Sequence, residues 1–90
     1  MVRIELLINN KLGLHARAAG KFVEAASRFE SEIWLAKDKS RVNGKSIMGI
    51  LTLAAAKGEI VVIEVEGPDE EKALKTLKKL VLSGFGENKK

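Results

Sequence analysis

The sequence has no cysteine and a single histidine, His15, among its 90 residues. Without cysteine the chain cannot form a disulfide scaffold, a thiolate metal site or a thiol nucleophile. One histidine also excludes a metal site built from several imidazoles. We therefore expect neither a metal ion nor a cofactor.

Long hydrophobic runs are also lacking. The longest stretch without a charged residue extends from Ser46 to Ala56, well short of the roughly 18 apolar residues that a membrane-spanning helix needs. The first residues, MVRIELLI, carry charges at Arg3 and Glu5 and offer no small-residue cleavage site, so they do not resemble a secretory signal. These features predict a cytoplasmic protein with no membrane insertion.

The composition that is present fits a small folded domain. Hydrophobic residues make up 46% of the chain and charged residues 31%, which is typical of globular proteins and too apolar for a disordered one. A chain of this length folds around one core, so we expect a single domain over residues 1–90. The net charge of +4 indicates an anionic partner, which could be nucleic acid, a membrane surface, a phosphate or an acidic protein.

Hydrophobic periodicity predicts four strands and three helices. Alternation of apolar and polar residues predicts strands at 2–8, 32–37, around 41–43 and 59–66. Apolar residues spaced three and four apart predict helices at about 16–29 and 69–83, the second ending at Gly84, and a short helix suits 46–55. We expect residues 85–90, which end in the patternless ENKK, to fray.

The resulting order, β-α-β-β-α-β-α, is a split βαβ plan with one added helix. Such a plan predicts an α+β fold in which helices cover one face of an antiparallel sheet. The pattern does not decide the strand order, because ferredoxin-like domains share the first six elements in another arrangement.

His15 stands at the predicted start of the first helix, where serine, threonine, aspartate and asparagine are the preferred caps. A helix N-terminus has unpaired N–H groups and roughly half a positive charge, which makes it an anion site. Imidazole is a good nucleophile near neutral pH. A phosphoryl group on it would meet the N–H groups of Ala16 and Arg17, and the Arg17 guanidinium could bind the same oxygens. Gly13 allows a backbone turn that would expose the ring.

These residues predict reversible phosphoryl carriage on His15. The alternative is that His15 merely ends a loop and Arg17 is a solvated charge. No nucleotide motif accompanies them: NGKS at 43–46 resembles the end of a P-loop, but that motif needs glycine at position 39, where this chain has Lys39. The phosphoryl group would therefore come from another protein.

The second predicted helix opens at Ser46, a preferred capping residue. A phosphate on Ser46 would also be stabilised at that helix start and would add nearly two negative charges to a basic surface, which could block an acidic partner. The helix carries apolar residues on more than one side, so either they fill the core or Met48 and a neighbour form an exposed patch for partners.

Nucleic-acid binding is the competing function from another class, because the chain is basic and has the split βαβ plan. The strand at 59–66 has no aromatic residue on which a base could stack, and no GxxG loop occurs. We therefore expect no nucleic-acid partner.

Three separated segments resemble one known family, the histidine-containing phosphocarrier protein HPr. They are GLHARAA at 13–19, KSIMGILTLAAAKG at 45–58 and SGFGE at 83–87. The resemblance covers nearly the whole chain. It implies an open-faced β-sandwich whose four-stranded antiparallel sheet has the order 1-4-2-3, with three helices on one face.

The same resemblance implies the function and its residues. His15 would accept a phosphoryl group at Nδ1 from phosphorylated Enzyme I, which is charged by phosphoenolpyruvate, and pass it to the IIA domains of sugar permeases. Arg17 would stabilise the transferring group. In some bacterial groups an ATP-dependent HPr kinase phosphorylates the serine that matches Ser46, and Ile47, Met48 and Leu51 match positions that contact partners. A small carrier of this kind is expected to be a monomer.

The sequence departs from the commonest family pattern at Ala18, where many members have proline. This departure leaves a second branch open, because related carriers serve nitrogen-related relays whose acceptors are not sugar permeases. A purely regulatory partner protein acting through Ser46 is a third reading. Family members of that kind lack the active histidine, which this chain has.

Overall fold

A computed structural model describes residues 1–87 of the chain. Its elements are β1 (Val2–Leu7), α1 (Ala16–Ala26), β2 (Glu32–Lys37), β3 (Ser40–Asn43), α2 (Ile47–Thr52), β4 (Ile60–Glu66) and α3 (Glu70–Leu82), followed by a short 3₁₀ helix, η1 (Gly84–Gly86). The order β-α-β-β-α-β-α predicted from the sequence is confirmed, and η1 is an addition to it.

The four strands form one antiparallel sheet in the order β1-β4-β2-β3. On the face of the sheet that points to the core, Ile63 of β4 pairs with Ile4 of β1 on one side and with Leu35 of β2 on the other. The three inward residues of β4, Val61, Ile63 and Val65, are fully buried, as the alternating pattern predicted. The strand order implied by the family resemblance is therefore confirmed.

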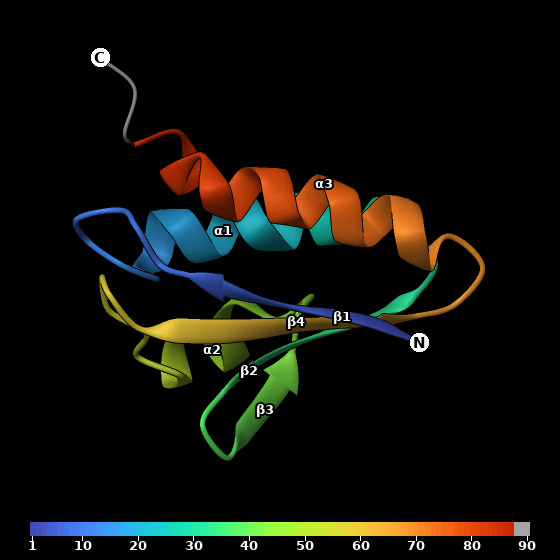
Figure 1. Ribbon diagram of the computed structural model, residues 1–90, viewed down its shortest axis with the longest axis horizontal. Coiled ribbons are helices and arrows are strands. Elements are labelled where there is room, and N and C mark those ends of the chain that lie inside the picture. Colours follow the sequence, from blue (N-terminus) through green and yellow to red (C-terminus); the bar gives the residue numbers. More distant parts are fainter. Residues whose placement is uncertain (88–90) are drawn as a thin grey trace.

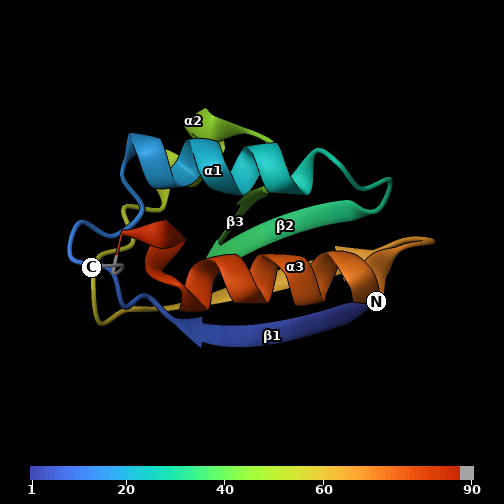
Figure 2. The ribbon, with the colours of Figure 1, turned by 90° about the horizontal axis from the view of Figure 1, so that it is seen from above.

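Figures 1 and 2 show α1 and α3 side by side over one face of this sheet. α3 lies over β1 and β4, and α1 runs beside it on the side of β2. α2 packs against α1 and β3, with Gly49 against Val42, whose side chain contacts the core. No helix within residues 1–87 is both long and apolar enough to span a bilayer.

The other face of the sheet is open. Glu64 on β4 lies opposite Arg3 on β1 and Trp34 on β2. The Arg41 guanidinium stacks 4.0 Å from the centre of the Trp34 ring, and its Nε lies 2.7 Å from a Glu64 carboxylate oxygen. Charged and amphipathic side chains on this face let one side of an antiparallel sheet remain in water.

Two helices end earlier than the sequence predicted. We expected the first helix to reach Phe29, but α1 ends at Ala26. The N–H groups of Arg28 and Phe29 bond to carbonyls three residues back, in a tighter turn than that of an α-helix. Phe29 still packs on the core from that turn. The second helix was expected to reach Ala55, but Ala54 adopts a left-handed φ of 50°, which a continuing helix does not allow.

The expectation that the C-terminal segment frays is wrong for residues 85–87. We expected residues 85–90 to fray, yet the Phe85 side chain is only 1% exposed and lies in the core. Gly84 ends α3 with a φ of 67°, as predicted, and turns the chain inward. Lys21 on α1 then donates a 2.7 Å hydrogen bond to the Phe85 carbonyl. Residues 85–87 are therefore anchored, and residues 88–90 lie outside the described part of the chain.

The start of α3 is tied to the start of β2. The Asp69 carboxylate accepts hydrogen bonds from the N–H groups of Glu30 and Ser31, each at 3.0 Å, and from the Ser31 hydroxyl at 2.5 Å. These bonds hold the pKa of Asp69 below its usual value, the Ser31 hydroxyl having the largest effect and the Glu30 N–H the next.

Candidate functional site

His15 is the N-cap of α1, as the sequence predicted. Its backbone is extended, with φ −80° and ψ 179°, and its carbonyl accepts the first helical hydrogen bond from the Ala19 N–H at 2.8 Å. Its side chain makes no capping hydrogen bond. The first N–H groups of a helix have no acceptor inside the helix, and those of Ala16 and Arg17 lie at the same helix start as the His15 ring.

The loop before His15 is fixed by a close backbone approach at Gly13. Gly13 has a φ of 66°, and a Cβ at this position would lie 2.5 Å from the Ala55 carbonyl oxygen. The next residue, Leu14, is buried and its N–H donates to the same Ala55 oxygen at 2.9 Å. Only glycine fits here without strain, and the turn that it permits presents the His15 ring at the surface.

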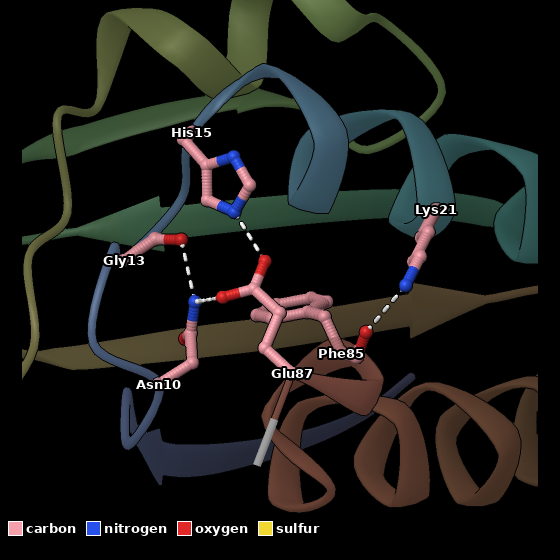
Figure 3. A network of polar contacts seen from close by, with 6 residues as sticks. All are labelled: Asn10, Gly13, His15, Lys21, Phe85 and Glu87. Atoms are coloured by element: carbon pink, nitrogen blue, oxygen red, sulfur yellow. Dashed lines mark hydrogen bonds and ion pairs between the residues drawn. The ribbon is translucent and has the colours of Figure 1, made fainter. Parts of the chain in front are cut away.

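The His15 ring is held by a carboxylate from the other end of the chain. Figure 3 shows Nε2 of His15 facing one carboxylate oxygen of Glu87, with which it forms a hydrogen bond. The other Glu87 oxygen accepts a 2.9 Å hydrogen bond from the side-chain amide of Asn10. That amide is fully buried and also donates to the Gly13 carbonyl at 2.8 Å. The second ring nitrogen, Nδ1, lies on the edge of the ring away from Glu87.

Glu87 is ionised in this network. Its pKa lies below the usual value, mainly because the Asn10 amide donates a hydrogen bond to the carboxylate. Partial burial opposes this effect, and His15 and Lys21 lower the pKa further. The side chains of His15 and Glu87 are 26% and 17% exposed, so the pair lies at the surface but is partly shielded from water.

Glu87 and Asn10 were missed by reasoning from the residues. Glu87 is 72 positions from His15 in the chain, and no periodicity or spacing connects the two. The one signal was that Glu87 closes the SGFGE segment of the family resemblance, which was given no role of its own.

Arg17 lies at the same surface as His15. Its side chain is exposed, and it lines a surface hollow together with His15, Lys11, Ala16 and Glu87. Within residues 1–87 it forms no ion pair. The exposed guanidinium leaves room for a phosphoryl group, and its role in binding one stays a prediction.

Ser46 caps α2, as the sequence predicted. Its hydroxyl oxygen accepts a 3.0 Å hydrogen bond from the Gly49 N–H. The structure also separates the apolar residues of this region into two groups. Ile50 and Leu53 are buried, whereas Ile47, Met48 and Leu51 are 45%, 78% and 38% exposed. The three residues expected to contact partners therefore form an exposed apolar surface, which we call the α2 surface.

Among residues 1–87, no three histidine, cysteine, aspartate or glutamate side chains gather closely enough to hold an ion. The chemistry available at His15 is that of a nucleophilic imidazole, helix N–H groups and a free guanidinium, which together suit the temporary binding of a phosphoryl group.

Comparison with known proteins agrees with this geometry. A family model described as the PTS HPr component phosphorylation site matches residues 2–83. The phosphocarrier protein HPr of Neisseria meningitidis serogroup A is 53% identical over 87 residues, which cover 97% of this chain and 98% of that protein.

Solved structures show the same fold. HPr-C-His from Thermoanaerobacter tengcongensis has a TM-score of 0.94 and 49% identity, covering 99% of this chain and 100% of that one. A structure described as an HPr dimer from the same organism has a TM-score of 0.78 and 50% identity, covering 97% of this chain and 100% of that one. With a family model, a close relative and solved structures in agreement, the chain belongs to the HPr phosphocarrier family of the phosphotransferase system.

Proposed function

We propose that His15 accepts a phosphoryl group from phosphorylated Enzyme I and transfers it to the IIA domains of sugar permeases. The observation that carries this proposal is the position of the His15 ring, partly exposed at the start of α1 and free of any capping bond. Family membership supports the same role.

In the proposed step the Nδ1 lone pair attacks phosphorus, a nitrogen–phosphorus bond forms, and the bond between phosphorus and the donor breaks. The phosphoryl oxygens then accept hydrogen bonds from the N–H groups of Ala16 and Arg17 and from the Arg17 guanidinium. The chain turns over only with its partners, so we regard it as a carrier with a phosphohistidine intermediate and not as an enzyme.

Incubation with phosphoenolpyruvate and Enzyme I tests the proposal. We expect one acid-labile phosphate on the chain and none on a His15→Ala variant. An Arg17→Ala variant should accept phosphate more slowly, whereas Arg28→Ala, which removes an exposed arginine just beyond α1, should not. Full acceptance by His15→Ala would contradict the proposal.

The acceptors distinguish the two branches of the family. We propose the sugar relay, in which phosphate passes from His15 to a IIA domain of a sugar permease. The nitrogen-related relay is the alternative, since Ala18 replaces the commoner proline. Parallel transfer assays with both kinds of IIA domain decide between them, and faster transfer to the nitrogen-type domain would replace the sugar assignment.

Ser46 is proposed as a second, regulatory phosphorylation site. Its side chain is partly exposed at the start of α2, and a phosphate there would add negative charge beside the α2 surface. Incubation with ATP and an HPr kinase should place phosphate on Ser46 and not on a Ser46→Ala variant. If every HPr kinase tested leaves the chain unmodified, Ser46 has only its capping role.

The α2 surface (Ile47, Met48 and Leu51) is proposed to contact Enzyme I and the IIA domains. Met48→Ala should raise the KM for transfer without a change in stability, because this side chain is 78% exposed. Leu7→Ala is the control, since Leu7 is also exposed but lies on β1. Equal effects of the two substitutions would exclude α2 as the docking surface.

We propose that the carrier acts as a cytoplasmic monomer. Because one relative is described as a dimer, the oligomeric state of this chain should be measured. Sedimentation velocity should give a mass close to the 9.8 kDa of one chain, and a mass twice as large would contradict the monomer.

A further inference from the structure

The C-terminal segment presents Glu87 to His15 from a rigid anchor. Phe85 is buried in the core, and its carbonyl is held by Lys21 of α1, the same helix that His15 caps. Glu87 therefore lies two residues beyond a buried side chain whose carbonyl is bonded to α1, and Figure 3 shows its carboxylate beside the His15 ring at the start of that helix.

Both carboxylate oxygens of Glu87 have a partner. One accepts from the buried amide of Asn10, whose other bond is to the Gly13 carbonyl, and the other contacts Nε2 of His15. An ionised carboxylate can only accept hydrogen bonds. The bond between Glu87 and His15 therefore requires a proton on Nε2, which leaves the lone pair of a neutral ring on Nδ1.

Building on the proposed function, we infer that Glu87 is a positioning residue that keeps a proton on Nε2 of His15 throughout the carrier's cycle. Glu87 acts only through the imidazole ring of His15, because it contacts Nε2 and not the phosphoryl group.

The protons and electrons of the cycle balance under this arrangement. When Nδ1 attacks phosphorus, the ring holds phosphorus on Nδ1 and a proton on Nε2 and so gains one positive charge, which the Glu87 carboxylate offsets. When the phosphoryl group moves on, the electrons of the nitrogen–phosphorus bond return to Nδ1. The ring is then again a neutral imidazole with the same proton.

The proton on Nε2 also determines the leaving group. With it, breaking the nitrogen–phosphorus bond releases neutral imidazole; without it, the same step would release an imidazolate anion, which is a much poorer leaving group. Glu87 therefore favours the loss of the phosphoryl group both to acceptors and, more slowly, to water.

Hydrolysis of the phosphorylated carrier measures this effect. Glu87→Ala removes the acceptor, and Glu87→Gln removes the negative charge and leaves one acceptor oxygen in place of the two that Asn10 and His15 contact. In mildly alkaline buffer we expect hydrolysis of phosphohistidine to slow about tenfold in both variants, because an adjacent opposite charge typically changes a protonation equilibrium by that factor or more.

Glu24→Gln is the matched control. It makes the same change of charge on an exposed residue of α1 that has no hydrogen bond or ion pair within residues 1–87. Its hydrolysis rate should stay within about twofold of the unmodified chain, since exposed and distant charges are screened by salt. Circular dichroism confirms that each variant is folded.

Nitrogen-15 NMR of the unphosphorylated chain gives a readout that needs no phosphate. We expect Nε2 of His15 to carry the proton in the unmodified chain and the protonated fraction of Nε2 to fall in Glu87→Ala. A proton on Nδ1, or hydrolysis at an unchanged rate in both Glu87 variants, would overturn the inference. Failure of the unmodified chain to accept any phosphate would instead count against the proposed function, and the NMR result would still decide where the proton lies.

Discussion

Phe85→Ala tests whether the C-terminal segment is part of the folded core. The Phe85 side chain is 1% exposed, and truncation of a buried phenylalanine to alanine costs about 3–5 kcal/mol. Alanine keeps the Cβ, so the left-handed backbone at this position, with φ 56°, is equally strained before and after the change. The expected loss therefore comes from the removed ring alone.

That loss is large for a chain of this size. A domain of about 90 residues has a free energy of unfolding of roughly 5–13 kcal/mol. Each kcal/mol lowers the Tm of such a domain by about 4–8 °C, so the Tm should fall by about 12 °C or more. Urea unfolding followed by circular dichroism measures the free energy, and a thermal scan measures the Tm.

Leu82→Ala is the control for this prediction. Leu82 lies near Phe85 in the chain but is 48% exposed, so its truncation should cost only about 0.5 kcal/mol. If the two variants lose the same small amount, residues 85–87 fray as the sequence had suggested, and the anchoring of Glu87 is refuted.

Three further substitutions test other contacts. Gly13→Ala should destabilise the fold and slow phosphorylation of His15 by Enzyme I, because a Cβ there lies 2.5 Å from a backbone carbonyl oxygen; unchanged urea unfolding would contradict this. Ser46→Ala should lower the free energy of unfolding by about 0.5–2 kcal/mol through loss of the α2 cap, and an unaltered urea midpoint would show that the cap contributes nothing. The pKa of Asp69 is lowered in the folded chain by hydrogen bonds from the Ser31 hydroxyl and the Glu30 N–H, so its stabilisation is present above the unfolded-state pKa and is lost as the pH falls through the folded value. Asp69→Asn should therefore be less stable at neutral pH and lose less on acidification, and urea midpoints measured across the acid range would refute this if the two curves ran parallel.

The secondary structure could be predicted where the hydrophobic pattern was strong. The predicted ends of β4 and α3 lie within one residue of the observed ends. The alternating pattern of β4 and the apolar stripe of α3 made both elements predictable. Helix ends were less predictable, because α1 and α2 end through backbone turns that depend on tertiary packing, as at Ala54. The strand order came from the family resemblance, since the pattern of elements fits two topologies.

In the functional site too, local features could be predicted from the sequence and long-range contacts could not. The position of His15 as the N-cap of α1, with Arg17 close behind it, could be predicted because a helix start and its neighbours are local in sequence. Glu87 could not be predicted, since its contact with His15 depends on Phe85 entering the core, and a lone phenylalanine between two glycines gives no periodic signal. The chemistry of the carrier can be read from a short motif, whereas the group that orients it is brought there only by the fold.

The central claim is that His15 carries phosphate at Nδ1. Phosphorylation by phosphoenolpyruvate and Enzyme I, followed by phosphorus and nitrogen-15 NMR, tests it most directly. We predict one phosphorus per chain, coupled to Nδ1 of His15 and lost on addition of a IIA domain. Phosphorus on any other atom, or phosphate that no IIA domain removes, would contradict it.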